Sequence, residues 1–99
     1  MTFIQTISFS SSRFDEMQKL MGEWEAAQPP GASPGFVGTR VLRDRDNANG
    51  FMVIAEFESY ETAMENSNRP ETGAFAKQMG ELTDGQPTYG NYDVLTPEG

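Results

Sequence analysis

The stretch that most constrains the fold is FMVIAEF, residues 51–57, which is apolar at six of its seven positions and carries one charge, Glu56. Short runs rich in aromatic and branched residues, preceded by a turn signal such as NANG at 47–50, are typical of β-strands covered on both faces. Helical patterns lie on both sides of this stretch in the sequence. We therefore expect one sheet with residues 51–57 as a central strand and helices packed on at least one face.

The composition excludes several kinds of site. The 99 residues, a length typical of one domain, include neither cysteine nor histidine, which excludes disulfides, thiolate nucleophiles, imidazole chemistry and the commonest transition-metal ligands. Seven basic and 15 acidic residues give a formal net charge of -8, which disfavours binding to nucleic acids and anionic membranes. No targeting segment is visible, and no apolar run approaches the ~20 residues that span a bilayer, so we expect a cytoplasmic protein.

A strand and a helix are predicted at the start of the chain. Residues 2–10 alternate with period two, which predicts a strand with one strongly apolar face. That face carries Phe3, Ile7 and Phe9. The serines at 10–12 are expected to cap a helix that begins near Arg13 and stops by Pro29. Its apolar positions recur every three or four residues and form one docking stripe: Phe14, Met17, Leu20, Met21 and Trp24.

A hairpin is predicted in the middle of the chain. Residues 36–44, FVGTRVLRD, form the second strand, and the connection at 45–50 is too short for a parallel crossover. Pairing Leu42 opposite Met52 divides the side chains between two faces, with Arg40 and Glu56 as diagonal neighbours. One face then carries Val37, Thr39, Val41, Val53, Ala55 and Phe57. The other carries Phe36, Gly38, Arg40, Leu42, Met52, Ile54 and Glu56.

A broken helix and a last strand are predicted in the second half of the chain. Ser59 is the expected N-cap of the helix. Pro70 should break it, since proline lacks an N–H and disfavours helix at the residue before it, and the helix should restart at Glu71 or Thr72. Residues 89–95, YGNYDVL, form the final strand. The inward helical positions are Tyr60, Ala63, Met64, Phe75, Met79 and Leu82.

The predicted order of strand, helix, strand, strand, broken helix, strand resembles the ferredoxin-like dimeric α/β barrel superfamily, in particular its antibiotic-biosynthesis-monooxygenase-like domains. The likeness is carried by FIQTISF with its serine-capped helix, TRVLRD to FMVIAEFES, SYETAMENSNRPETGAFAKQM and TDGQPTYGNYDVL. The resemblance implies an α+β single domain over residues 1–99, with a four-stranded antiparallel sheet and two main helices, the second broken near Pro70. It also implies a homodimer whose sheets face each other, and a small-molecule cavity between sheet and helices.

The resemblance leaves the function open between an enzyme and a binding module. Haem-degrading members of the superfamily typically hold iron through a histidine, which this chain lacks. The first hypothesis is a cofactor-independent monooxygenase-like enzyme that acts on a small aromatic or polyketide-like molecule without metal, flavin or haem. A substrate that ionises to an electron-rich carbanion can itself pass an electron to oxygen, so the protein needs only to favour the anion and exclude water. The alternative is a non-catalytic dimeric module that binds a small molecule or serves in assembly.

The candidate catalytic residues are Glu56, as a base, and Arg40, as a partner for an oxyanion; alternatively the two form a structural pair across the sheet or the dimer interface. The candidate ligand-binding residues are Trp24, as an N–H donor, with Tyr89 and Asn91 on the last strand. The simpler role of such aromatic residues is packing. An enclosed cavity with Arg40, Glu56, Trp24 or Tyr89 pointing into it favours the enzyme, whereas a filled core favours the module.

Two further features carry expectations. The polar residues 66–69 before Pro70 either open onto a pocket or form a solvated corner. The hairpin and the central strand are apolar on both faces, and two helices can cover only one face of a four-stranded sheet. We therefore expect a homodimer in which a second sheet covers the other face.

Overall fold

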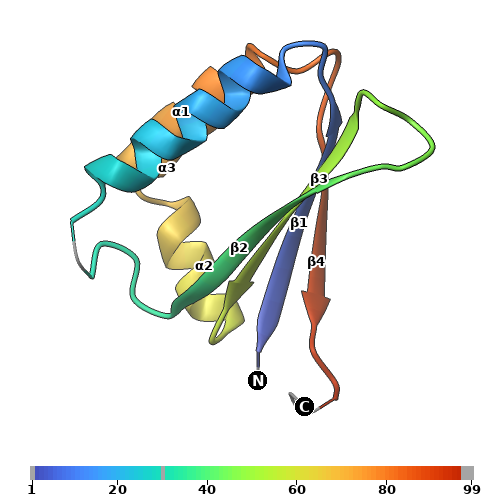
Figure 1. The fold of residues 1–99 in the computed structure, drawn as a ribbon. Helices are drawn as coiled ribbons and strands as arrows, with labels where there is room; N and C mark the ends of the chain where they lie inside the picture. Colours follow the sequence, from blue (N-terminus) through green and yellow to red (C-terminus); the bar gives the residue numbers. More distant parts are fainter. Residues whose placement is uncertain (1, 30, 97–99) are drawn as a thin grey trace.

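The fold is one antiparallel sheet with helices on one side (Figure 1). The computed structural model describes residues 2–29 and 31–96. Its elements are β1 (Phe3–Ser10), α1 (Phe14–Ala27), β2 (Phe36–Arg43), β3 (Gly50–Phe57), α2 (Tyr60–Ser67), α3 (Pro70–Gly80) and β4 (Thr88–Asp93). The strands are ordered β2-β3-β1-β4, so β3 is a central strand as predicted, and the α+β ferredoxin-like architecture is confirmed.

Alternation along the strands divides the sheet into two faces. The covered face, which packs against the helices, carries Phe3, Gln5, Ile7 and Phe9 of β1 and Phe51, Val53, Ala55 and Phe57 of β3. The open face carries Ile4, Thr6 and Ser8 of β1 and Met52, Ile54 and Glu56 of β3. None of the helices in the described part of the chain lies over the open face (Figure 1).

The register of the hairpin, which the sequence leaves open, is the pairing considered above, with Leu42 opposite Met52 and Arg40 opposite Ile54. The start of β2 differs from the prediction, because the register shifts between Phe36 and Gly38. Phe36 therefore pairs with Phe57 and lies on the covered face, where strict alternation placed it on the other. A bulge inserts a residue that period-two alternation does not anticipate. Val37, predicted to share a face with Val53, Ala55 and Phe57, is 56% exposed.

The buried core consists of two separate clusters at opposite ends of the sheet. Phe3 and Phe57 pack against Ala63 of α2 at one end. At the other end Phe9 and Phe51 pack against Met17 of α1. These contacts fix the helices at the two ends of the covered face and leave its middle without a core cluster.

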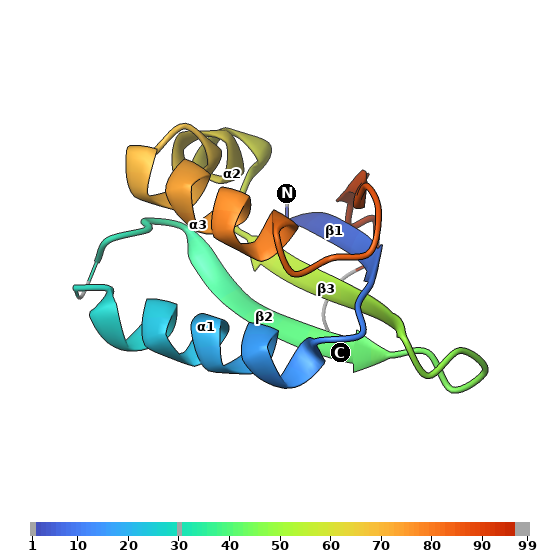
Figure 2. The same ribbon diagram turned by 90° about the horizontal axis from the view of Figure 1, so that it is seen from above.

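The helices α1 and α3 run alongside each other on the covered side (Figure 2). Their contact includes a stacked pair of rings, Trp24 and Phe75, whose centroids are 4.6 Å apart at an interplanar angle of 18°. The two helices therefore pack on each other as well as on the sheet. No helix within residues 2–29 and 31–96 is long and apolar enough to cross a membrane.

The helix starts confirm one predicted cap and correct another. Ser59 caps α2 as predicted: its Oγ accepts from the Thr62 N–H, and the Thr62 Oγ1 accepts from the Ser59 N–H. The predicted serine cap of α1 is wrong, since Arg13 holds the N-cap position without a side-chain cap. Ser11 is buried instead, and its Oγ donates to the Leu82 carbonyl and accepts from the Arg13 N–H. A buried hydroxyl needs such partners, so the tertiary contact replaces the local cap.

The broken helix lies where proline predicts it. The break lies between Ser67 and Pro70, and Pro70 is the first residue of α3 rather than the residue before its restart. Proline suits the first position because the missing N–H would have no helical partner there. The last strand is shorter than predicted and ends at Asp93.

Candidate ligand-binding cavity

A cavity of about 670 Å³ lies between the middle of the covered face and the helices. Its floor is formed by the sheet residues Gln5, Ile7, Val53 and Ala55. Its helical wall includes Met21, Trp24, Phe75 and Met79. A volume in this range suits a drug-sized ligand, and a mostly apolar lining with a few polar groups is typical of small-molecule sites.

The cavity follows from the distribution of side-chain size along the strands. Large phenyl rings hold the helices at both ends of the sheet, whereas the middle of β3 contributes only Val53 and Ala55. The Trp24 and Phe75 rings stack on each other at the helical side. The small side chains below and the paired rings above leave space that the core clusters do not fill.

Two of the three predicted ligand-binding residues line this cavity. Trp24 lies in the helical wall, stacked on Phe75, so it both packs and faces the cavity. Tyr89 of β4, opposite Ile7, is 58% exposed and lies at the rim. Asn91 is not among the lining residues; it sits opposite Gln5 and its Oδ1 accepts from the Gln5 Nε2 at 3.4 Å.

The predicted catalytic residues lie on the other side of the sheet. Glu56 is opposite Ile4 and Gly38, and Arg40 is opposite Ile54, so both belong to the open face and are diagonal neighbours as predicted. Arg40 is exposed and Glu56 is partly buried. The sheet separates this pair from Trp24 and Tyr89, so the five predicted site residues do not form one site.

A polar cluster at one end of the cavity adds residues that the predicted site lacks. We define the Arg69 cluster as Gln28, Ser33, Asn66 and Arg69, all of which line the cavity. Asn66 Oδ1 accepts from Ser33 Oγ at 2.9 Å and from Arg69 Nη1 at 3.2 Å. Arg69 Nη2 donates to Gln28 Oε1 at 2.9 Å. The polar break at 66–69 thus opens onto a pocket, one of the two outcomes expected for it.

Arg69 also pairs with a carboxylate outside the cavity. Its Nη2 lies 3.1 Å from Glu71 Oε2, with the Arg69 side chain 20% exposed and that of Glu71 58% exposed. An ion pair with one partner this exposed is screened by water and contributes little to stability. Arg69 Nε also donates to Glu71 Oε2, so Nη2 is shared between Gln28 and Glu71 while Nη1 donates to Asn66.

Thr72 lies beside the cluster and has an unpartnered oxygen. Its Oγ1 is buried and has no hydrogen-bond partner among the described residues. Leaving a buried hydroxyl unsatisfied costs about 1–3 kcal/mol, so such a group is a candidate contact for a ligand or a water. Thr72 is also one of the residues that line the cavity.

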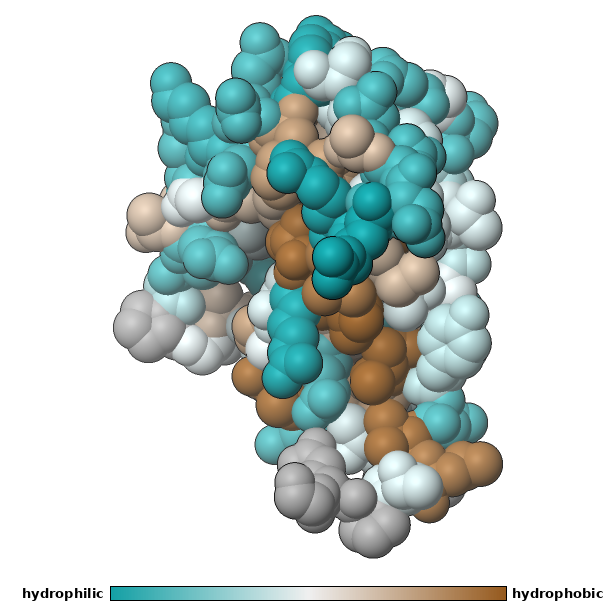
Figure 3. Space-filling view, turned by 45° about the vertical axis from the view of Figure 1, so that its right-hand side comes forward, coloured by the Kyte–Doolittle hydropathy of each residue, from teal (hydrophilic) through white to brown (hydrophobic). Residues whose placement is uncertain are grey.

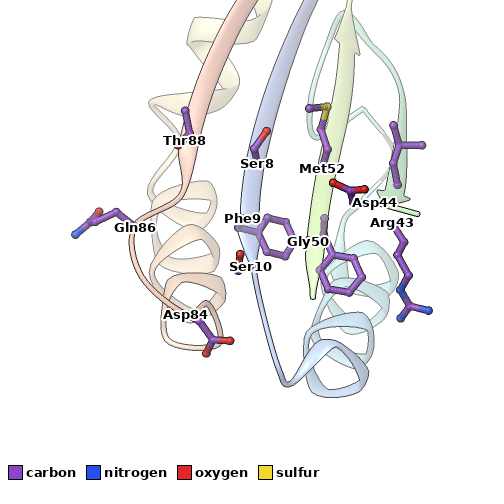
Figure 4. A pocket seen from close by; sticks show the side chains of 12 residues that line it. Ser8, Phe9, Ser10, Arg43, Asp44, Gly50, Met52, Asp84, Gln86 and Thr88 are labelled. Carbon is purple, nitrogen blue, oxygen red and sulfur yellow. The ribbon is translucent and has the colours of Figure 1, made fainter. Parts of the chain in front are cut away.

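The open face has a hollow of its own. It measures about 530 Å³ and is lined by residues that include Ser8, Leu42, Met52, Asp84 and Thr88. Figure 4 shows Ser8, Met52 and Thr88 on three strands of the sheet and Asp84 on the connection that precedes β4. A hydrophobic band runs down this side of the molecule between hydrophilic flanks (Figure 3). Leu42 and Met52 of the open face line the hollow together with polar side chains such as Ser8, Asp84 and Thr88.

No group of three or more acidic side chains within residues 2–29 and 31–96 is placed to hold a metal ion. No family model matches the sequence, and no curated protein matches it. The fold, in contrast, matches solved structures over nearly the whole chain.

Three of these structures illustrate the similarity. SnoaB, a cofactor-independent oxygenase from Streptomyces nogalater, is 18% identical, with a TM-score of 0.80 over 97% of this chain and 95% of that chain. A protein assigned to the antibiotic biosynthesis monooxygenases from Caulobacter crescentus is 15% identical, with a TM-score of 0.80 over 96% of this chain and 91% of that chain. One so assigned from Nitrosomonas europaea is 11% identical, with a TM-score of 0.78 over 99% of this chain and 94% of that chain. At these identities the likeness establishes the fold, and this chain has the ferredoxin-like fold of the antibiotic-biosynthesis-monooxygenase-like domains.

Proposed function

We propose that the protein is a cofactor-independent monooxygenase-like enzyme that binds a small aromatic or polyketide-like molecule in the cavity between sheet and helices. The observation that carries the proposal is the cavity itself, about 670 Å³ in volume. Its wall offers the stacked rings of Trp24 and Phe75 to a flat apolar body, and the Arg69 cluster offers polar contacts at one end. The shared fold with SnoaB, which is described as a cofactor-independent oxygenase, supports the same reaction class.

The reaction requires few catalytic groups from the protein if the substrate ionises easily. A carbanion or phenolate can pass an electron to oxygen, and the protein accelerates the reaction by stabilising the anion with N–H donors and excluding water. The Trp24 indole is such a donor on the cavity wall, and the Arg69 cluster places further polar groups there. Glu25 is the only carboxylate among the described lining residues, and it is exposed. The proposed substrate therefore ionises without a protein base.

The proposal includes a homodimer formed through the open face, in a cytoplasmic location. The open face carries Ile4, Met52 and Ile54 beside the 42% exposed Leu42. Apolar patches of this kind on a sheet are commonly interaction surfaces. Arg40 and Glu56 would then lie at the interface between protomers, the structural alternative expected for this pair.

One observation favours a second candidate, a dimeric module that binds a small molecule without turnover. The predicted base, Glu56, faces away from the cavity, so catalysis would depend on the substrate's own reactivity. Both candidates use the same cavity. They differ only in whether oxygen is consumed.

Oxygen uptake with a panel of quinol and anthrone-like compounds tests the proposal. Ala55 lies on the cavity floor, and Ala55→Phe should fill the space and abolish uptake and binding. Ala74→Phe is the matched control, because Ala74 is exposed on α3 and is not a lining residue. Binding without oxygen uptake supports the module. Turnover that survives Ala55→Phe would place the reaction elsewhere and contradict the proposal.

A further inference from the structure

The Arg69 cluster joins two segments that are distant in sequence, residues 28–33 and 66–69. Gln28 follows the end of α1, Ser33 lies in the loop before β2, Asn66 is in the last turn of α2, and Arg69 immediately precedes α3. Hydrogen bonds from Arg69 reach both amide side chains, and Ser33 adds a second donor to Asn66. The cluster is thus built from tertiary contacts rather than from one motif.

The chemistry of arginine fixes which atoms of this cluster remain for a ligand. A guanidinium carries only donors, so each amide must present its oxygen to it. Asn66 Oδ1 receives Arg69 Nη1 and Ser33 Oγ, and Gln28 Oε1 receives Arg69 Nη2. The amide nitrogens, which are donors, are consequently turned away from Arg69. Because both residues line the cavity, these donors are the polar atoms that they offer to a ligand.

Thr72 provides an independent observation at the same end of the cavity. Its Oγ1 is buried without a hydrogen-bond partner among the described residues, and Thr72 is one of the residues that line the cavity. Its hydroxyl can donate to a ligand oxygen. Thr72 also lies in the first turn of α3, where the unpaired N–H groups of the helix favour negative charge.

We propose that this end of the cavity selects ligands that carry an acceptor oxygen, such as a carboxylate, phenolate or enolate, and that Arg69 is the positioning residue that turns Gln28 and Asn66 into donors. This inference rests on the proposed function in one respect, that a ligand occupies the cavity. It adds the chemical class that the polar end recognises. The preference opposes the net charge of -8, which by itself attracts cations.

Two water-soluble probes of similar size test the selection: 2-naphthoate, which presents acceptors, and 2-naphthylmethylammonium, which presents donors. Trp24 is the only tryptophan of the chain and lines the cavity, so the NMR signal of its indole N–H reports binding at this site. We expect 2-naphthoate to bind at least about tenfold more tightly than the ammonium probe, roughly the effect of one good hydrogen bond. This comparison uses the unaltered protein and needs no variant.

Variants of Arg69 test its positioning role. Arg69→Met should reduce the preference for 2-naphthoate to less than about threefold, and Arg69→Lys should restore it only in part, because an ammonium lacks the fork that holds both amides. The matched control is Arg45→Met, which removes the same charge from the exposed β2–β3 connection. Circular dichroism melting checks that each variant is folded.

The outcomes separate the two proposals. Equal affinity for the two probes, or an Arg69→Met protein that keeps the full preference, overturns the selection for acceptor oxygens while the cavity remains a binding site. Failure of both probes to shift the Trp24 signal overturns occupancy of the cavity by aromatic molecules, and the selection with it.

Discussion

The two faces of the sheet are built by the same strands but differ in packing and in helical cover. The covered face has Phe3, Phe9, Phe51 and Phe57 at its ends, each at most 8% exposed, and empty space in the middle. The open face has no helix over it in the described part of the chain, and its apolar side chains form a continuous band (Figure 3). On the covered face, the core side chains do not fill the space beneath the helices. On the open face, apolar side chains lie without a helix over them in the described part of the chain.

This difference indicates two kinds of occupant. Space enclosed between a sheet and helices suits a small molecule, because its walls are already held apart by packed ends. A broad apolar face suits another protein surface, since only a surface of similar extent can remove it from water. We therefore expect substitutions on the covered face to act on stability and ligand binding, and those on the open face to act on association.

The largest expected effect is that of Phe57→Ala. Phe57 is 2% exposed and packs against Phe3 and Ala63, so truncation leaves a void at one end of the covered face. We expect a loss of about 3–5 kcal/mol in the free energy of unfolding, measured by urea denaturation. Tyr92→Ala, at a 58% exposed aromatic residue on the other side of the sheet, is the control and should cost less than about 1 kcal/mol at low protein concentration. Similar losses for both would remove the distinction between the faces.

Next in size is the effect of Ile54→Lys on association. Ile54 lies on β3 in the middle of the open face, opposite Arg40 and Thr6, and a charge buried there without a partner is unfavourable. We expect the dimer dissociation constant to rise by at least about 100-fold, equivalent to ~2.7 kcal/mol, as measured by analytical ultracentrifugation. Gln18→Lys adds the same charge on the exposed side of α1 and should have no such effect. A parent protein that is a stable monomer at micromolar concentration contradicts the dimer itself.

The third prediction concerns the loop that bounds the cavity beside α2. Gly35 has φ +84°, and an added Cβ would lie 2.6 Å from the Thr62 side chain, which completes the cap of α2. Gly35→Ala should therefore cost about 1–3 kcal/mol in the free energy of unfolding. Gly31→Ala is the matched control, since Gly31 also has positive φ, +76°, but an added Cβ meets nothing within 4 Å. Thermal melting in which Gly31→Ala costs as much would show that backbone strain alone, rather than the contact with Thr62, sets the loss.

Local patterns allowed most of the fold to be predicted. Alternation identified the strands, and proline located the break before α3, because these signals act between neighbouring residues. The bulge at Phe36 and the tertiary bonds of Ser11 were missed. Both depend on partners that a local pattern does not contain.

The site was harder to predict than the fold. Trp24 was identified because the docking stripe of α1 faces the cavity. Glu56 was chosen as the single charge in the central strand, but alternation does not state which face the helices cover. Arg69 and Gln28, 41 positions apart, meet only through the packing of the loop before β2 on the broken helix. A contact of that separation leaves no periodic signal in the sequence.

The smallest expected effect is that of Glu56→Gln on ligand binding. Glu56 lies on the open face and the cavity lies on the covered face, so the sheet stands between the carboxylate and a bound molecule. Glutamine keeps the size of the side chain and removes its charge. We expect the affinity for 2-naphthoate, followed through the Trp24 signal, to stay within about twofold of the parent value.

The same variant should act on the other face. If Arg40 and Glu56 lie between two protomers, removal of the carboxylate leaves the Arg40 charge without that neighbour, and the dimer dissociation constant should change by up to about tenfold. Sedimentation of Glu56→Gln measures this, and Glu23→Gln, at an exposed position of α1, controls for the same change in net charge. Loss of turnover with an intact dimer would instead identify Glu56 as the base. The reacting molecule would then have to reach the open face. The assignment of ligand binding to the covered face and of association to the open face would be wrong.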